Sequence, residues 1–548
     1  MNIKRLDHLG IVAGIIKDLG LIEAIDQRLQ KDELGQEKIT PGEAVAGMIL
    51  NGLGFSDKPL SLTPIFFETK ALEILFRPGV EASDFNRHKL GKILDRAYGY
   101  GCESLFFEIA SVVCLQEKVD LRFNSLDTTT LSLTGEYLQD SDENMIKIVH
   151  GYSKDVRPDL KQVVQELMVS QDGGVPLITQ SWDGNSSDSK IFDKRAKALI
   201  DYFKKSDSPR YLIADSKLYS RENAENLQHL KFITRIPGTN REESQVILSA
   251  ISDGKWNELD KKNKYTSRSI VHHGIAQRWI IVFSEQARER ISKTLPKHIK
   301  KEREKVEKSL WHLSNQAFHC ASDAEKAALK MERQCRYHRI HILGIEEKRH
   351  HAETGRPKKD SAPIKISYFV KASLLEDKSA IGAHLDEKSC YVLGTNIPEA
   401  ELSDVEVING YKRQNNSVEN MGFRFLKDPI FFTSSLFLKK ASRIQGLLMV
   451  MTLALLVYSI AQRRIRQALK DKDETLPNQI DKPTKTPTMR WLFQLMEGLH
   501  FVVMNVNKVA TRMIHGWTDI KKKIVMLMGD TIMRIYQVTE NLNFGSGG

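Results

Sequence analysis

The chain has little cysteine, and its cysteines follow no regular spacing. Its 548 residues include five cysteines, and none of them forms a Cys-x-x-Cys pair. A scattered, odd-numbered set is typical of reduced thiols in a cytoplasmic protein rather than of a disulfide framework. Cys320, Cys335, His338 and His341 could hold zinc, but their irregular spacing does not favour it.

Apolar segments that could target the chain to a membrane are also missing. The first residues, Met1 to His8, contain no apolar signal core, so we expect no secretory signal. The most apolar run, 446–461, is shorter than the roughly 20 residues that span a bilayer. This run predicts a buried core helix, and we expect no membrane partner.

Charge of one sign is in excess. The net charge is +11, from 81 Lys and Arg against 70 Asp and Glu, with 41% hydrophobic and 28% charged residues. This composition is ordinary for a globular protein, and the length predicts three or four domains. The positive field favours a polyanionic partner, either nucleic acid or a membrane surface.

The order of predicted elements indicates the fold class. Residues 1–118 show helical spacing and predict an all-α domain that binds DNA ends or dimerises. Residues 119–237 follow the order β-β-β-α-β-α-β, which suits an α/β, ribonuclease-H-like (retroviral-integrase-like) core with its first and fourth strands side by side. The predicted strands are 121–133, 162–170, 175–182, 211–215 and 231–236, with a Gly173-Gly174 hairpin turn and a helix from Asp188.

Residues 238–400 interrupt this pattern and predict a mixed β/α insertion domain. The core resumes at 401–470, where a helix starts at a capping box, Ser403 to Glu406, and ends at Asp428 before a proline. A helical region, 471–544, would bind DNA or dimerise, and 545–548 resemble an appended linker. Within the insertion we expect β-like runs at 245–248, 265–272 and 278–284, a charged helical region at 285–332, and strands at 364–370 and 391–396.

Three carboxylates stand on predicted strands and on the capped helix. Asp127 follows Ser125-Leu126, Asp215 follows a strand that ends at Ala214, and Glu419 lies inside the helix. Carboxylates so placed can bind two Mg²⁺ ions about 3.5–4 Å apart, which clamp the attacking and leaving oxygens of a phosphoryl displacement. Taken singly, each aspartate is more often a turn former or helix cap. Together they indicate cutting and joining of nucleic acid.

With these residues the chain resembles the DDE transposases of bacterial insertion sequences. The similar group has its third acid in a Tyr-x2-Arg-x3-Glu-x6-Lys signature and a large insertion before that glutamate. The resemblance covers about residues 120–470, and 151–162 and 422–429 also look like segments of the family. By this resemblance the catalytic residues are Asp127, Asp215 and Glu419, which bind the metal ions, with Tyr411 and Lys427.

The signature departs from the family pattern in this chain. Gln414 stands where arginine is expected, and the spacing is Tyr-x2-Gln-x4-Glu-x7-Lys, one residue longer on each side of Glu419. On a regular α-helix, residues eight apart diverge by about 80°. A π-bulge on either side would restore the common face. Otherwise Arg413 or Arg424 would supply the phosphate contact.

The resemblance implies a cut-and-paste recombinase of the bacterial cytoplasm, associated with the nucleoid. It would act as a homodimer on paired DNA ends, binding the terminal inverted repeats of its element. Cleavage and joining to target DNA would use two Mg²⁺ ions per site, which Mn²⁺ can replace. Two other classes stay open: a catalytically inactive DNA-binding regulator on the same scaffold, and a hydrolytic nuclease without strand transfer.

Further DNA contacts are expected outside the triad. A tryptophan from the insertion could stack on an extruded base, although tryptophan more often packs in a core. A basic loop at 348–359 could enter a minor groove or be merely solvated. The candidate DNA-binding residues are Arg413, Gln414, Arg424, Lys427, Trp256, Trp279, Arg356, Lys358 and Lys359.

Overall fold

The chain folds into two compact units. The computed structural model describes residues 2–30, 37–55, 58–135, 137, 145–204, 210–216, 219, 221, 223–351, 363–429, 438–506 and 509–538. The first unit comprises Met1–Thr234, His273–Ile275 and Ala400–Gly548, and the second comprises Arg235–His272 and Ala276–Glu399.

A mixed sheet forms the centre of the first unit, with strands in the order β4-β3-β2-β5-β6. Strands β2, β3 and β4 form an antiparallel meander, and β5 and β6 run parallel to β2. The first and fourth strands of this core are therefore neighbours, as the sequence predicts. The strands are β2 (Phe123–Leu133), β3 (Lys161–Ser170), β4 (Pro176–Trp182), β5 (Tyr211–Ala214) and β6 (Phe232–Arg235).

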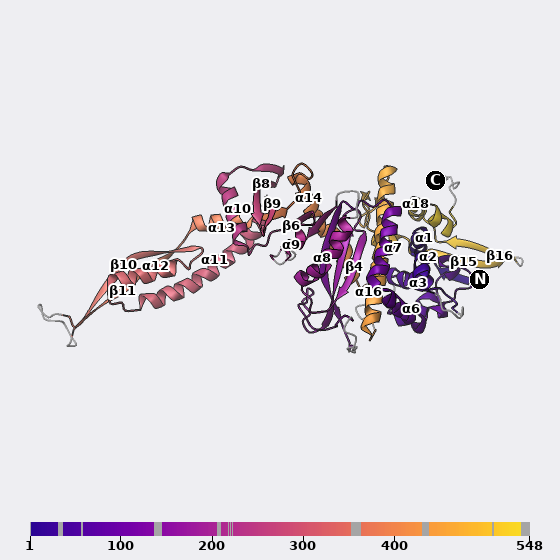
Figure 1. Ribbon diagram of the computed structural model, residues 1–548, viewed down its shortest axis with the longest axis horizontal. Coiled ribbons are helices and arrows are strands. Elements are labelled where there is room, and N and C mark those ends of the chain that lie inside the picture. Colours follow the sequence, from indigo (N-terminus) through magenta and orange to yellow (C-terminus); the bar gives the residue numbers. More distant parts are fainter. Residues whose placement is uncertain are drawn as a thin grey trace. The chain divides into compact units, whose positions relative to one another are not determined.

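Helices cover both faces of this sheet (Figure 1). On one face, Arg195 of α8 (Asp188–Lys204) lies 3.3 Å from the carboxylate of Glu166 on β3. On the other face, Thr452 of α16 (Ala441–Asp471) lies 3.2 Å from Thr179 of β4. Side chains alternate between the faces of a strand, so Glu166 and its neighbour Leu167 point to opposite layers.

Helix α16 is the apolar run noted in the sequence. By length and composition it could cross a membrane, but 89% of its most apolar window is buried inside the unit. It packs against β4 and against helices of the N-terminal region. The prediction of a buried core helix is confirmed, because an all-round apolar helix needs partners on every side.

The N-terminal region is mainly helical, as predicted, but the chain ends contradict the expected all-α domain and helical tail. Strand β1 (Asn2–Arg5) pairs with β15 (His500–Val506), which pairs with β16 (Val509–His515). A four-residue strand is too short to show a recognisable pattern in the sequence. It forms because a partner almost 500 residues away supplies its hydrogen bonds. The main helices here are α1 (Leu9–Asp18), α2 (Leu21–Arg28), α3 (Pro41–Leu53), α4 (Thr63–Phe67), α5 (Leu72–Leu75), α6 (Arg87–Tyr100), α7 (Cys102–Gln116), α17 (Met489–Leu495), α18 (Asp519–Met528) and α19 (Asp530–Ile535).

The second unit contains four sheet strands in the order β12-β9-β8-β7. The run 245–248, expected as β-like, lies in helix α10 (Arg241–Asp253). Asn240 caps that helix at its start, and Gly254 ends it in the left-handed conformation. The capping residues at the two ends therefore favour a helix over a strand here. The other elements of this sheet region are β7 (Asn257–Asp260), β8 (Asn263–His272), β9 (Ile275–Ser284), α13 (Lys378–Lys388) and β12 (Cys390–Thr395).

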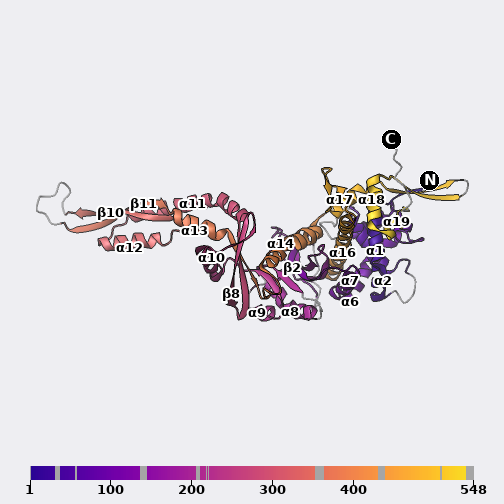
Figure 2. The same ribbon diagram turned by 90° about the horizontal axis from the view of Figure 1, so that it is seen from above.

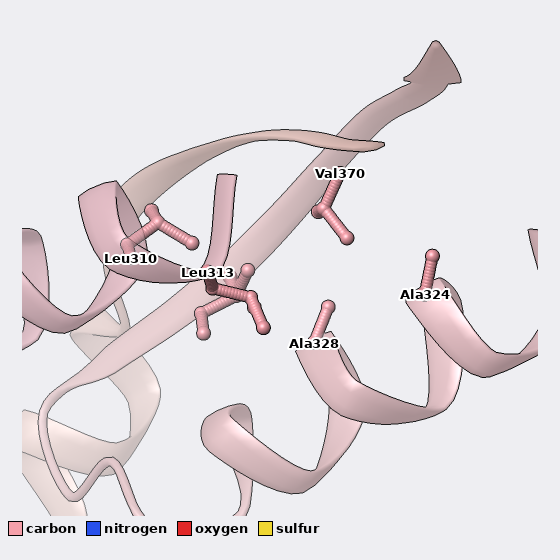
Figure 3. Packing of buried hydrophobic residues seen from close by; sticks show 6 residues of the cluster. Leu310, Leu313, Ala324, Ala328 and Val370 are labelled. Atoms are coloured by element: carbon pink, nitrogen blue, oxygen red, sulfur yellow. The ribbon is translucent and has the colours of Figure 1, made fainter. Parts of the chain in front are cut away.

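The rest of the second unit is an arm of two helices on a hairpin (Figure 2). The hairpin pairs β10 (His338–His350) with β11 (Lys365–Glu376), and the helices are α11 (Glu285–Ser314) and α12 (Ala321–Glu332). The charged helical region expected at 285–332 comprises these two helices, which are separated by residues 315–320. Figure 3 shows the small core between these elements, made of Leu310, Leu313, Ala324, Ala328, Ile340 and Val370.

Candidate active site

Asp127 and Asp215 lie on adjacent strands. Strand β2 pairs in parallel with β5, and Leu126 is opposite Ala214. Asp127 directly follows Leu126, and Asp215 directly follows Ala214. Neighbouring strands lie about 4.8 Å apart. Strand β5 stops at Ala214 whereas β2 continues to Leu133, so the edge of β2 opens beside Asp127. Both aspartates line one small pocket at this edge.

The same local hydrogen bond orients both aspartates. Asp127 Oδ1 accepts from the backbone N–H of Thr128 at 2.7 Å, and Asp215 Oδ1 accepts from the N–H of Ser216 at 2.7 Å. Both side chains are only partly buried. A carboxylate fixed by its own backbone yet open to the pocket is suited to bind a cation there.

A further carboxylate, Asp188, lines the same pocket. It is the first residue of α8, and its Oδ1 accepts a short hydrogen bond from the hydroxyl of Thr128. Lys154 lies beside it, with Nζ 3.5 Å from Asp188 Oδ2 and 3.8 Å from Asp127 Oδ1. Sequence reasoning placed Asp188 only at a helix start and did not single out Lys154. The one sequence signal for Lys154 was that residues 151–162 look like a segment of the family.

Close backbone packing holds the segment that carries Lys154. A Cβ on Gly151 would lie 2.2 Å from the carbonyl oxygen of Gly184, so only glycine fits this approach. The backbone N–H of Lys154 donates to Thr130 Oγ1 at 2.9 Å, and Gln162 Nε2 donates to the carbonyl of Tyr152 at 3.2 Å. These contacts fix the segment against β2 and β3.

Glu166 forms a buried wall of the pocket. It is 1% exposed, and burial raises the pKa of its carboxyl to about 8, although a hydrogen bond from Trp182 Nε1 at 3.0 Å acts in the opposite sense. Arg195 lies 3.3 Å away, but it also pairs with Glu103, which offsets its charge. Glu166 Oε1 has no hydrogen-bond partner within the described part of the chain. A buried polar atom left without a partner is costly, so it favours a ligand in the pocket.

The helix expected to carry Glu419 is present, and its middle turns are a π-helix. The run comprises α14 (Asp404–Gln414), the π-helix η4 (Asn415–Phe423) and α15 (Arg424–Lys427). The capping box is confirmed, since Ser403 N donates to Glu406 Oε2 at 3.0 Å and Glu406 N donates to Ser403 Oγ at 3.4 Å. The helix ends at Lys427, before Asp428, as predicted.

The π-helix resolves the long spacing of the signature. Each α-helical step turns the chain by about 100°, and each π-helical step by roughly 82°, because the hydrogen bonds span one residue more. Four steps of each kind separate position 411 from 419, and four of each separate 419 from 427. Each interval sums to roughly two full turns, about 728°, so with ideal helix geometry positions 411, 419 and 427 recur at nearly the same angle around the helix axis. This is the outcome that a π-bulge was expected to give.

The π-helix lies against the sheet next to the strand of Asp127. Ser417 Oγ is 3.4 Å from Ser125 Oγ, and Ser125 precedes Asp127 by two residues. An added Cβ on Gly422 would lie 2.7 Å from the side chain of Leu167, which is opposite Asp127 in the β2–β3 pairing. Position 419 therefore lies between two contacts to the sheet. The side chain of Glu419 is outside the described part of the structure.

The accessory residues of the signature have different surroundings. Lys427 Nζ forms an ion pair of 2.6 Å with Asp155, the neighbour of Lys154. Tyr411 is half-buried, and Arg413 and Arg424 are exposed. The expectation that Gln414 contacts DNA needs correction, because its side chain is only 6% exposed at the end of α14.

The tryptophans of the insertion also differ. Trp279 is 0% exposed and donates from Nε1 to Gln277 at 3.1 Å, so its expected stacking on DNA is corrected to a place in the core of the second unit. Trp256 is half-buried, with the ammonium of Lys264 5.0 Å from its ring centroid. The expected DNA contacts Arg356, Lys358 and Lys359 lie outside the described residues.

The donor set of the pocket suits a hard cation. Mg²⁺ is bound by one or two carboxylates with waters and substrate phosphates, and Asp127 and Asp215 offer two carboxylates. Within the described residues, no group of three or more His, Cys, Asp or Glu side chains is placed to hold an ion. The free volume of the pocket is about 10 Å³, room for about one water-sized species. A further protein ligand would come from Asp188, which lines the same pocket, from position 419 or from rearrangement.

Similarity to known proteins is found for the N-terminal region and for most of the chain. Residues 1–111 match the model of a family described as a domain of unknown function, DUF4277. No curated protein matches the chain. The chain is similar to a piggyBac transposase seen by cryo-electron microscopy in a synaptic complex with hairpin DNA. The identity is 11% and the TM-score 0.35, over 89% of this chain and 80% of that chain.

Proposed function

We propose that this chain is a DDE transposase with a ribonuclease-H-like core, which cleaves the ends of its element and joins them to target DNA. One observation carries the proposal: Asp127 and Asp215 are neighbours on parallel strands and line one pocket. The strand order β4-β3-β2-β5-β6 and the helix that brings position 419 to the same sheet support it.

In this proposal each residue around the pocket has a defined task. Bound Mg²⁺ or Mn²⁺ would activate a water or 3′-hydroxyl and stabilise the charge on the leaving oxygen. Asp127 and Asp215 would hold the ions, with Glu419 as the third acid. Lys427, on the same helical face as position 419, would contact the phosphate beside the scissile bond.

The partners in this proposal follow from charge and from the reaction. A net charge of +11 suits contact with the phosphate backbone of double-stranded DNA. Joining two ends of one element requires both ends in one complex, so we propose a homodimer. We also propose action on bacterial chromosomal DNA in the cytoplasm.

An assay on end-labelled DNA that carries the terminal inverted repeats tests this function. The protein with Mg²⁺ should release the end and then transfer its 3′-hydroxyl to a second duplex. Binding without cleavage would instead indicate an inactive regulator, and cleavage without transfer would indicate a hydrolytic nuclease. Glu419→Gln serves as an internal check, because the third acid is needed for cleavage but not for DNA binding.

A further inference from the structure

Lys154 places a positive charge beside two carboxylates of the pocket. Its Nζ lies 3.8 Å from Asp127 Oδ1 and 3.5 Å from Asp188 Oδ2, and it donates to Thr128 Oγ1 at 2.8 Å. These three side chains are at most about one quarter exposed, at 24% for Lys154, 18% for Asp127 and 15% for Asp188. Such a placement makes the ammonium a counter-ion of the carboxylates within the chain itself.

Other nearby cations are already paired with other acids. Lys427 pairs with Asp155 at 2.6 Å, and Arg195 pairs with Glu103 and Glu166. The ion pairs recorded for Asp127 and Asp188 within the described part of the chain are those with Lys154.

The ammonium of Lys154 can move although its backbone is fixed. The N–H of Lys154 is bound to Thr130, and Gly151 is pressed against Gly184. The long stem of a lysine side chain has several rotatable bonds, so the ammonium can leave the acids without a change in the loop. The geometry therefore separates a fixed attachment point from a mobile charge.

The pocket has too little room for a lysine and two divalent ions together. Mg²⁺ lies about 2.0–2.1 Å from its oxygen ligands, so an ion on Asp127 would lie within a few ångströms of an ammonium that is itself 3.8 Å from the same carboxylate. The free volume is about 10 Å³, and the space is lined by Glu166, whose buried Oε1 lacks a hydrogen-bond partner in the described structure. A cation and the ammonium therefore compete for one place.

We propose that Lys154 is a displaceable counter-cation that keeps divalent metal out of the pocket until DNA is bound. This inference rests on the proposed function. In the free protein the ammonium lies between Asp127 and Asp188 and offsets one of their two negative charges. A phosphate of bound DNA offers the ammonium a new partner, and the ions then enter the vacated place. DNA and metal thereby raise one another's affinity, and an enzyme without DNA holds no loaded metal centre.

The test measures Mn²⁺ binding to the full chain without DNA, from the electron paramagnetic resonance signal of free Mn²⁺. Lys154→Met removes the charge and keeps the stem, so it should tighten Mn²⁺ binding at least about tenfold, a typical size for coupling between sites. Lys154→Arg keeps the charge and should stay within twofold of the parent. Lys147→Met is the matched control, since Lys147 lies in the same connection and its recorded hydrogen bonds are made by its backbone, to Asp183 and Gly184.

A second measurement uses a short DNA duplex of arbitrary sequence. DNA should tighten Mn²⁺ binding to the parent at least about tenfold and to Lys154→Met by much less, since the competitor is already absent. Lys154→Gln is measured in parallel and should behave like Lys154→Met, and melting curves show that each variant is folded. Unchanged Mn²⁺ affinity in both charge-removing variants overturns the inference.

A double variant separates failure of this inference from failure of the proposed function. If Asp127→Asn with Asp215→Asn abolishes Mn²⁺ binding while Lys154→Met leaves it at the parental value, only the role of Lys154 is wrong. If the double variant binds Mn²⁺ as the parent does, with or without Lys154→Met, the pocket is not the metal site. Both proposals then fall.

Discussion

The pocket region of the first unit and the arm of the second unit both pack helices on strands, but they are held together differently. The pocket collects residues from four separate segments, and beneath it α16 has Leu453, Leu455 and Leu456 fully buried. The arm relies on six buried side chains, two of them alanines, between elements that follow one another closely in sequence (Figure 3). One region is a thick core and the other a thin one.

This difference has consequences for function. Contacts between distant segments must all form together, which makes the pocket region cooperative and suited to hold carboxylates in fixed positions. Local contacts with little buried apolar area allow the arm to open without unfolding the rest. We therefore expect substitutions in the first unit to affect the whole molecule or its chemistry, and substitutions in the arm to act locally.

The largest expected effect is on catalysis. Asp127→Asn and Asp215→Asn should each lower the rate of DNA cleavage by about a thousandfold or more, because a metal ligand that contributes charge is lost. DNA binding, measured by gel shift without metal, should change less than threefold.

Asp473→Asn is the matched control, because this exposed aspartate pairs with Lys485 outside the pocket. It should cleave at the parental rate. Wild-type cleavage by either pocket variant would remove that aspartate from the site.

The second prediction compares the two cores directly. Leu455→Ala in α16 should cost about 3–5 kcal/mol of unfolding free energy, the upper part of the range for a leucine in a core that cannot collapse. Leu313→Ala in the arm, where the side chain is 7% exposed, should cost about 2 kcal/mol or less. Denaturant unfolding gives both values.

Hydrogen exchange then shows where each of these leucine variants opens. Leu455→Ala should speed exchange throughout the first unit, whereas Leu313→Ala should speed it only in α11, α12, β10 and β11. Equal costs with equally global exchange would show that the arm is not an independent region.

The third prediction concerns pH. His8 is fully buried, and burial lowers its pKa to about 4, although a contact of its Nε2 with the Leu53 carbonyl at 2.8 Å acts in the opposite sense. The unfolded chain takes up this proton from about pH 6.5 downward and the folded chain only near pH 4. Stability of the first unit should therefore fall by about 3 kcal/mol as pH falls from 6.5 to 4.

The arm should respond at lower pH. Burial acts to raise the pKa of Glu302, but hydrogen bonds from His338, Tyr337 and Arg336 outweigh it, and the pKa is lowered. The stability from this carboxylate is present above its unfolded pKa and is lost only as pH falls through the lower folded value. Melting curves between pH 7 and 3 should show the first unit weakening first, and His8→Gln should remove that early loss.

The sequence predicted those parts of the site that depend on order along the chain. Because the strands follow the pattern β-β-β-α-β, the aspartates 127 and 215 could be placed side by side before any coordinates. The excess spacing around Glu419 left two alternatives, a π-bulge or a phosphate contact from Arg413 or Arg424, and a π-helix is present at Asn415–Phe423. Both inferences use local rules of strand order and helical geometry.

The remaining features depend on contacts that no local rule describes. Lys154 meets the carboxylates because its loop is bound to Thr130 of β2 and because Gly151 packs closely against Gly184, and nothing in its own neighbours encodes these contacts. The strand at Asn2–Arg5 needs β15 as its partner. Trp279 was assigned to DNA by residue type, whereas its position on the inner strand β9 buries it.

The smallest predicted effect concerns ion pairs. In the arm, Arg303 and Glu307 form an exposed pair of 3.3 Å one helical turn apart, so Glu307→Gln should cost about 0.5 kcal/mol or less and should cost nothing measurable in 1 M salt. In the first unit, Glu117 is 10% exposed and holds Arg464 at 2.7 Å at the end of α16. Glu117→Gln leaves that guanidinium with Asp18 alone, so its cost should be several times larger and should persist in salt, because solvent screens a buried pair less. Equal, salt-sensitive losses of stability at both sites would mean that burial does not distinguish the ion pairs of the two regions. The two regions would then differ in their apolar cores but not in the strength of their ion pairs.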